Sequence, residues 1–133
     1  MQKDCCFQSK NKRFRYRAAA IIVENGCVLF AGNEINDYYY SIGGGVHIGE
    51  TAEEAVQREV FEETGIHYEI DHLAIIHENF FVESTGKYKG LDSHEIAFYF
   101  LMKLLLHLYF LHLFYSKFHH QYLKLDSHFY PCF

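Results

Sequence analysis

The alternation of apolar and polar residues predicts a series of strands interrupted by one helix. Phe14 to Ile22 has the period of two that is typical of a strand. Further strands are expected at residues 27–31, 38–42, 68–79 with a continuation to 82, and 94–103, and polar loops at 32–37 and 83–93. Asn25-Gly26 lies between the first two apolar runs and predicts a β-hairpin.

A helix is predicted from about Ala52 to about Thr64, because both of its ends carry cap signals. Thr51 and Glu54 have the spacing of an N-terminal capping box, and Gly65 suits the left-handed position that ends a helix. One side of the helix is apolar and is predicted to pack on a sheet. Its members are Ala52, Ala55, Val56 and Val60.

The same helix gathers three carboxylates on one face, because Glu59, Glu62 and Glu63 stand at i, i+3 and i+4. Repulsion between Glu59 and Glu63 costs roughly a few tenths of a kcal/mol, which a bound cation would reverse. Mg²⁺ prefers carboxylate oxygens and is commonly shared with substrate phosphates. Taken alone, however, a glutamate-rich helix face is more often a solvated surface.

A glycine turn precedes the helix, at Gly43, Gly44 and Gly45. Glycines let the backbone take positive φ and approach a ligand closely, and a carbonyl of the turn could add a metal ligand. Arg58 stands next to Glu59 and could orient a carboxylate through a charge-assisted hydrogen bond. A plain turn without any ligand is the alternative.

Length and charge narrow the function classes. A chain of 133 residues, half of them hydrophobic, predicts one domain with a core. The net charge of −5 argues against a nonspecific nucleic-acid binder. The first strand has basic residues on one side, which we interpret as a solvated strand edge, with a position near a phosphate or base as the alternative: Arg13, Arg15 and Arg17. The polar first residues do not predict a secretory signal, so a cytoplasmic protein with reduced thiols is expected.

The distances between residues 44 and 66 decide between the interpretations of the helix face. The stretch reads Gly44, five residues, Glu50, seven residues, Arg58-Glu59-Val60, one residue, Glu62-Glu63, one residue, Gly65-Ile66. This pattern resembles the Nudix box, with every defining position filled, and the likeness extends to about residues 13–103. The resemblance implies an α/β fold, the Nudix α/β/α sandwich with a mixed sheet. The box helix would cover one face and a C-terminal helix the other.

The resemblance also implies an activity, the metal-dependent hydrolysis of the diphosphate linkage in a nucleoside diphosphate derivative. Carried over by position, the metal and catalytic carboxylates are Glu59, Glu62 and Glu63, which would bind Mg²⁺ or Mn²⁺. Many members of the family use a further glutamate outside the box as metal ligand or general base, and Glu95 is the candidate here. The remaining carried-over roles are supporting side chains, Glu50 and Arg58, and a carbonyl ligand, Gly43.

Two features leave the substrate open. Many family members have a Trp and a Pro before the glycines, and here Tyr and Ser-Ile-Gly replace them, which makes the turn less rigid. Candidate substrate-binding residues are Gly44, Gly45, Lys87 and Tyr88, although an exposed polar loop is the alternative for the last two. ADP-ribose or a nucleotide sugar is the first candidate, and a (deoxy)nucleoside triphosphate, as in MutT-type pyrophosphohydrolases, is the second. The expected partner is a small nucleotide, not a nucleic acid or a membrane, with a homodimer as one assembly to test.

The last thirty residues have a different composition, so the chain divides into a flexible arm (1–12), the Nudix hydrolase domain (13–103) and an atypical tail (104–133). The tail contains no Gly, Ala, Val, Ile or Glu and is dominated by Leu, His, Tyr and Phe. Three interpretations stay open: a degenerate helical segment, a membrane segment, or an out-of-frame translation that replaces the true C-terminus. In the last case the product could be non-catalytic. The coding DNA tests this hypothesis, because another reading frame after Lys103 should encode a plausible strand and helix.

Overall fold

The computed structural model describes residues 3–24, 26–33, 36–104 and 127–131. Its centre is the long strand β2 (Lys12–Glu24), which runs parallel to β7 (Asp92–Leu104). On the far side of β7 lies β6 (Tyr68–Val82), which is antiparallel to β7. On the other side, β2 continues to β3 (Cys27–Asn33) and β4 (Asn36–Ser41), both in antiparallel pairs. The sheet is therefore mixed, as predicted.

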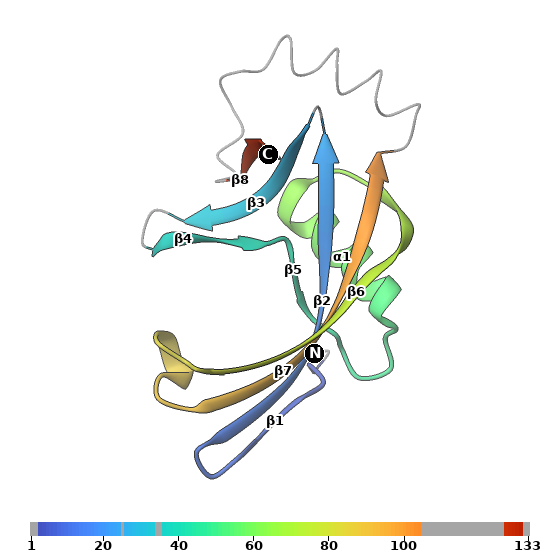
Figure 1. Ribbon diagram of the computed structural model, residues 1–133. Coiled ribbons are helices and arrows are strands. Elements are labelled where there is room, and N and C mark those ends of the chain that lie inside the picture. Colours follow the sequence, from blue (N-terminus) through green and yellow to red (C-terminus); the bar gives the residue numbers. More distant parts are fainter. Residues whose placement is uncertain (1–2, 25, 34–35, 105–126, 132–133) are drawn as a thin grey trace.

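Three short strands complete the sheet (Figure 1). Strands β1 (Cys6–Ser9) and β5 (Gly43–Gly45) both pair with β2, at different positions along it. Strand β8 (Ser127–Pro131) pairs antiparallel with β3. The connection between β6 and β7 contains a short 3-10 helix, η1 (Gly86–Tyr88).

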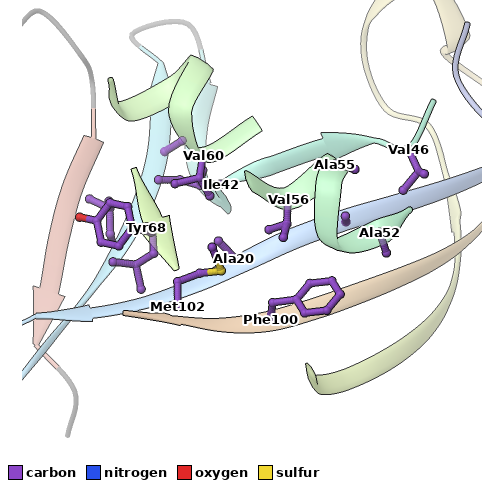
Figure 2. Close-up of a cluster of buried hydrophobic side chains, with 14 residues drawn as sticks. Ala20, Ile42, Val46, Ala52, Ala55, Val56, Val60, Tyr68, Phe100 and Met102 are labelled. Carbon is purple, nitrogen blue, oxygen red and sulfur yellow. The ribbon is translucent and has the colours of Figure 1, made fainter. Parts of the chain in front are cut away.

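The single α-helix of the described ranges, α1 (Ala52–Thr64), covers one face of the sheet. Its predicted apolar side is buried, and Val56 and Val60 pack with Phe100 of β7 in the core (Figure 2). From β2, Ala20 and Ile22 face the same cluster. A helix on the opposite face was expected from the C-terminal tail, and that prediction falls largely on residues 105–126, outside the described ranges.

The two faces of β2 have different roles. Its register with β7 places Ala18 beside Phe98 and Ala20 beside Phe100, on the face toward α1. The intervening residues point to the other face, where Arg15 lies beside Glu95 and Arg17 beside Ala97. The predicted period of two thus separates an apolar core face from a face with arginines. That second face is not a solvated strand edge, because the arginines are half-buried and bonded.

Three expectations about local structure were wrong. Residues 1–12 were predicted to be a flexible arm, but Cys6–Ser9 form β1, which pairs with β2, and Asp4 bridges to His47. The predicted loop at 32–37 is shorter, because β3 and β4 extend into it. No strand was recognised in the tail, yet Ser127–Pro131 form β8. Backbone pairing needs no apolar pattern in the short segment that pairs, so the pattern missed these strands.

The membrane alternative for the tail falls mostly on residues 105–126, outside the described ranges. No helix among the described residues is long and apolar enough to span a membrane.

The Asn-Gly hairpin is confirmed by the antiparallel pairs Val23–Val28 and Glu24–Cys27 on either side of it.

Candidate active site

Both ends of helix α1 are fixed by the caps that the sequence predicted. Thr51 Oγ1 accepts a hydrogen bond from the Glu54 amide at 3.2 Å, and Glu54 Oε2 accepts one from the Thr51 amide at 2.9 Å. Gly65 has φ of 71° and donates its amide to the Phe61 carbonyl at 2.8 Å. The capping box sets the residue at which the helix begins, and therefore which residues of its last turns point toward the glycine turn.

Two box carboxylates lie against the glycine turn. The amide of Gly43 donates a hydrogen bond to Glu63 Oε1 at 2.9 Å. A Cβ atom on Gly44 would lie 2.4 Å from the carboxylate of Glu59, so only glycine leaves room for that carboxylate. The glycine turn, which lies between β4 and α1, therefore brings Glu59 and Glu63 to the same short stretch of backbone.

Arg58 ties the turn, the loop and the helix together. Its Nε and Nη2 donate to the two oxygens of Glu50 at 2.8 and 2.9 Å, in the fork geometry of a bidentate pair. Its Nη1 donates to Glu59 Oε1, and Nη2 also donates to the Gly45 carbonyl at 3.0 Å. The hydrogen bonds to Glu50 and Glu59 raise the pKa of Arg58, so the guanidinium stays charged. Arg58 thus fixes the orientation of Glu59 relative to the turn.

Glu50 and Glu63 have opposite electrostatic environments. The hydrogen bonds from Arg58 lower the pKa of Glu50 to about 2, helped by the His47 amide, which donates to Glu50 at 2.9 Å. Burial raises the pKa of Glu63, and the hydrogen bond from the Gly43 amide partly opposes that rise. Glu50 is therefore charged at neutral pH, whereas the partly desolvated Glu63 would be stabilised by a cation.

Glu62 and Glu95 are held differently from these two. The side chain of Glu62 is 60% exposed, with Arg58 Nη1 at 3.8 Å. Glu95 is buried on β7 and pairs with Arg15 Nε at 3.0 Å. No contact between Glu95 and a box glutamate is found in the part of the chain that the structure describes. The structure thus brings together Glu59, Glu63 and the turn, but leaves Glu95 with an arginine.

The donor atoms at the turn fit a hard divalent cation in kind. Glu59 and Glu63 supply carboxylate oxygens and Gly43 a carbonyl, the ligand types that Mg²⁺ prefers. Within residues 3–24, 26–33, 36–104 and 127–131, no three His, Cys, Asp or Glu side chains lie close enough together to hold one ion. The binding of a cation by Glu62 and Glu95 therefore stays a prediction from the sequence.

A family model described as the NUDIX domain matches residues 13–108, which include the helix, the turn and most of the sheet. The chain belongs to the Nudix family. The resemblance of its box is thereby confirmed, and the mixed sheet with α1 on one face matches the fold of solved Nudix structures.

Several Nudix relatives are similar over part of their length. A MutT-like protein from Streptomyces ambofaciens is 37% identical over 62 residues, which are 47% of this chain and 40% of that protein. The match thus spans less than half of that curated relative. A MutT Nudix hydrolase from Burkholderia pseudomallei has 25% identity and a TM-score of 0.53, over 69% of this chain and 67% of that one. A MutT protein from Methanosarcina mazei Go1 has 26% identity and a TM-score of 0.56, over 74% and 69%.

Arg17 is a residue near the Nudix turn whose position the sequence did not predict. Its Nη1 donates to Ser41 Oγ at 3.1 Å, and its Nη2 donates to the carbonyls of Ser41 and Gly43 at 2.6 and 3.2 Å. Arg17 therefore holds the chain that enters the turn, and its positive charge partly opposes the rise in pKa that burial causes at Glu63. The alternation of arginines in the sequence marked its face of the strand, but not its partners.

Lys87 and Tyr88, the two loop residues predicted to bind substrate, lie beside Arg13 of β2. The guanidinium of Arg13 lies 4.0 Å from the ring centre of Tyr88, and Lys87 Nζ lies 4.7 Å from it. Arg13 also pairs with Glu83 at 2.7 Å. No contact with the glycine turn is found for Lys87 or Tyr88 among the described residues, so a role in substrate binding rests on the sequence alone.

Proposed function

We propose that this chain is a Nudix pyrophosphohydrolase that cleaves the diphosphate linkage of a nucleoside diphosphate derivative, with Mg²⁺ or Mn²⁺ as cofactor. ADP-ribose or a nucleotide sugar is the substrate that we propose first. The observation that carries the proposal is the approach of Glu59 and Glu63 to the backbone of Gly43 and Gly44. Carboxylates beside a backbone without side chains offer a place where a cation and a phosphate can meet.

The proposed reaction is the attack of water on one phosphorus of the diphosphate. A bound Mg²⁺ would supply charge neutralisation at the phosphate oxygens and a lower pKa for water. Glu59 accepts the proton of the attacking water, because its carboxylate lies against Gly44 at the turn, whereas no contact of Glu95 with the turn is found among the described residues. The bond from phosphorus to the bridging oxygen breaks. The products are a nucleoside monophosphate and a second phosphorylated group.

A cavity on the face of the sheet that carries the arginines offers a place for the nucleoside near the glycine turn. The cavity has a volume of about 350 Å³, within the range of ligand pockets, and is lined mainly by apolar side chains such as Ile21, Phe30 and Tyr99. Ser41 also lines it and is bonded to Arg17, which in turn contacts Gly43. Arg17 thus links an apolar cavity for a base to the turn proposed for the phosphates.

A second candidate function is a MutT-type pyrophosphohydrolase of (deoxy)nucleoside triphosphates. Three relatives at 25% identity or more, those from Streptomyces ambofaciens, Burkholderia pseudomallei and Methanosarcina mazei Go1, are named MutT or MutT-like proteins. A UDP-X diphosphatase has a TM-score of 0.56 but only 16% identity, over 88% of this chain and 50% of that one, so its likeness concerns the fold alone. The relatives' names therefore favour this second candidate, while the turn and its carboxylates serve both equally.

The experiment is the hydrolysis of a nucleotide panel by the full chain in Mg²⁺, with products identified by chromatography. The panel includes ADP-ribose, nucleotide sugars and nucleoside triphosphates.

We predict that Glu63→Gln keeps the fold but lowers turnover at least about a hundredfold, the scale of losing a charge-stabilising group. Near-normal turnover in that variant would remove Glu63 from the mechanism. A folded chain that cleaves nothing would favour the non-catalytic alternative.

We also propose a cytoplasmic setting. Cys5 and Cys6, adjacent in the chain, form no disulfide among the described residues, which suits a reducing compartment. Cell fractionation with an antibody to the chain tests this, and recovery outside the cytoplasmic fraction would contradict it.

A further inference from the structure

Four aromatic rings form a continuous row across β1, β2, β7 and β6. β1 and the adjoining ends of β7 and β6 lie at the end of the sheet that extends beyond α1 (Figure 1). The register places Phe7 opposite Phe14, Phe14 beside His94, and His94 opposite Phe80. Phe7 and Phe14 are stacked with ring centres 5.3 Å apart, and His94 and Phe80 are stacked at 4.3 Å. Phe14 and His94 meet edge to face at 5.4 Å. We call these four residues the ring platform.

The ring platform faces solvent and lines a cavity. Phe7 is 64% and Phe80 is 68% exposed, which is unusual for large apolar rings that already contact one another. The cavity beside them has a volume of about 620 Å³, the size of a small-molecule pocket. None of the box residues lines it. The platform is therefore separate from the glycine turn and has no role in the proposed hydrolysis.

A second, polar row lies beside the rings on the same face of the sheet. The register aligns Ser9 with Lys12, and Lys12 with Asp92. Each residue of this row stands two positions from a ring residue on the same strand, a separation of roughly 7 Å. Asp92 accepts a hydrogen bond from Asn11 Nδ2 at 3.1 Å, whereas Lys12 is exposed and forms no ion pair in the described part of the chain. Arg13 also lines the cavity but pairs with Glu83, so the cavity combines aromatic faces with Lys12 as its available cation.

We propose that the ring platform binds a small planar aromatic molecule that carries an anionic group. Stacking on the exposed rings would hold the aromatic part, and the Lys12 ammonium would pair with the anion about two residues away along β2. A nucleoside 5′-monophosphate and an aromatic carboxylate share this chemistry. A nucleic-acid strand is disfavoured, because the chain carries a net charge of −5 and the row supplies a single lysine.

The test uses the full chain in metal-free buffer and reads the site directly. The imidazole proton resonances of His94, assigned with His94→Gln, are followed by NMR during titration with AMP and, separately, with 4-hydroxybenzoate. A saturable shift with either probe is expected, and the tighter probe identifies the source of the shared chemistry. Adenosine, which lacks the anion, and inorganic phosphate, which lacks the ring, should each bind at least about fivefold more weakly. Because the readout needs no turnover, it is independent of the proposed hydrolysis.

Variants separate the two halves of the site. Phe80→Ala should weaken binding of the probe at least about fivefold, the lower limit for one lost stacking partner. Lys12→Gln should weaken the anionic probe but not adenosine. Ile76→Ala is the matched control, because Ile76 is also an exposed apolar residue of β6, 59% exposed, and does not line the cavity.

Three results would overturn the proposal. The first is the absence of any saturable shift of His94 with either probe, and the second is unchanged binding in Phe80→Ala while its melting curve shows a folded chain. The third is a dimer in size-exclusion chromatography that Phe80→Ala converts to a monomer, because a second copy of the chain would then occupy the platform.

Discussion

At the scale of single residues, a substitution of Gly44 is expected to affect hydrolysis more than folding. Gly44→Ala would place a Cβ atom 2.4 Å from the carboxylate of Glu59, which is the movable end of a side chain. The chain should therefore fold, with a melting temperature within a few degrees of wild type, while the displaced carboxylate lowers hydrolysis at least about tenfold. Steady-state kinetics and a thermal melt check both parts.

The neighbouring glycine supplies the contrast. Gly43→Ala would bring its Cβ atom to 2.3 Å from the Ala18 carbonyl oxygen, at a residue with φ of 143°. The clash is with backbone that cannot move aside, so this variant should lose stability as well as activity. If the two alanine variants lost stability and activity to the same degree, the clash at Gly44 would not be confined to the Glu59 carboxylate.

Glu50 gives the second prediction at this scale, a dependence of stability on pH. Arg58 lowers the pKa of Glu50 to about 2, below its ordinary value of 4.5. The ionised form therefore stabilises the folded chain above about pH 4.5, and that contribution is lost as the pH falls toward 2. Glu50→Gln should lower the free energy of unfolding at pH 7 by on the order of 2 kcal/mol.

The difference between wild type and Glu50→Gln, measured by urea unfolding, should shrink as the pH falls from 4.5 toward 2. Glu53→Gln serves as the control, because Glu53 is exposed and forms no ion pair within the described ranges. A difference that stays constant with pH would show that the loss is one of shape and not of charge.

At the scale of elements, the cap of α1 is predicted to contribute stability by itself. Thr51→Ala removes the hydroxyl that accepts the Glu54 amide and should cost about 1 kcal/mol, or roughly 3–5 °C in melting temperature. Thr85 is the matched control, because it precedes η1 in the same position but makes no side-chain cap hydrogen bond. If Thr85→Ala lowered the melting temperature equally, the capping box would not be the cause.

The elements also show which features a sequence can predict. The bounds of α1 agree with the prediction, because Thr51, Glu54 and Gly65 fix its ends through contacts within a few residues. Strand β1 was missed, since its four residues, Cys6–Ser9, are too few to show an apolar period and pair with β2 through backbone groups. Local chemistry was therefore predictable, and pairing between distant segments was not.

At the scale of the whole molecule, the same limit applies to the site. The i, i+3 and i+4 spacing and the box distances predicted a cluster that includes Glu59 and Glu63, and the structure places these two at the turn. The contacts of Arg17 with Ser41 and Gly43 depend on the pairing of β2 with β5, so no local pattern indicated them. The pairing of Glu95 with Arg15 likewise follows from the parallel register of β2 and β7. Side chains on one helix are predictable from spacing, whereas those brought together by a sheet require its register.

The shared core gives the last prediction, because it joins α1 to the sheet that holds the turn. Phe100 is 1% exposed and lies in the cluster with Val56 and Val60, so Phe100→Ala should cost about 3–5 kcal/mol, a large part of the stability of a small domain. Phe7→Ala, at a ring that is 64% exposed, should cost less than about 1 kcal/mol. Urea unfolding compares the two. Similar losses would mean that the face between α1 and β7 is not the main core. A selective loss in Phe100→Ala would show that this core holds the helix with its carboxylates on the sheet.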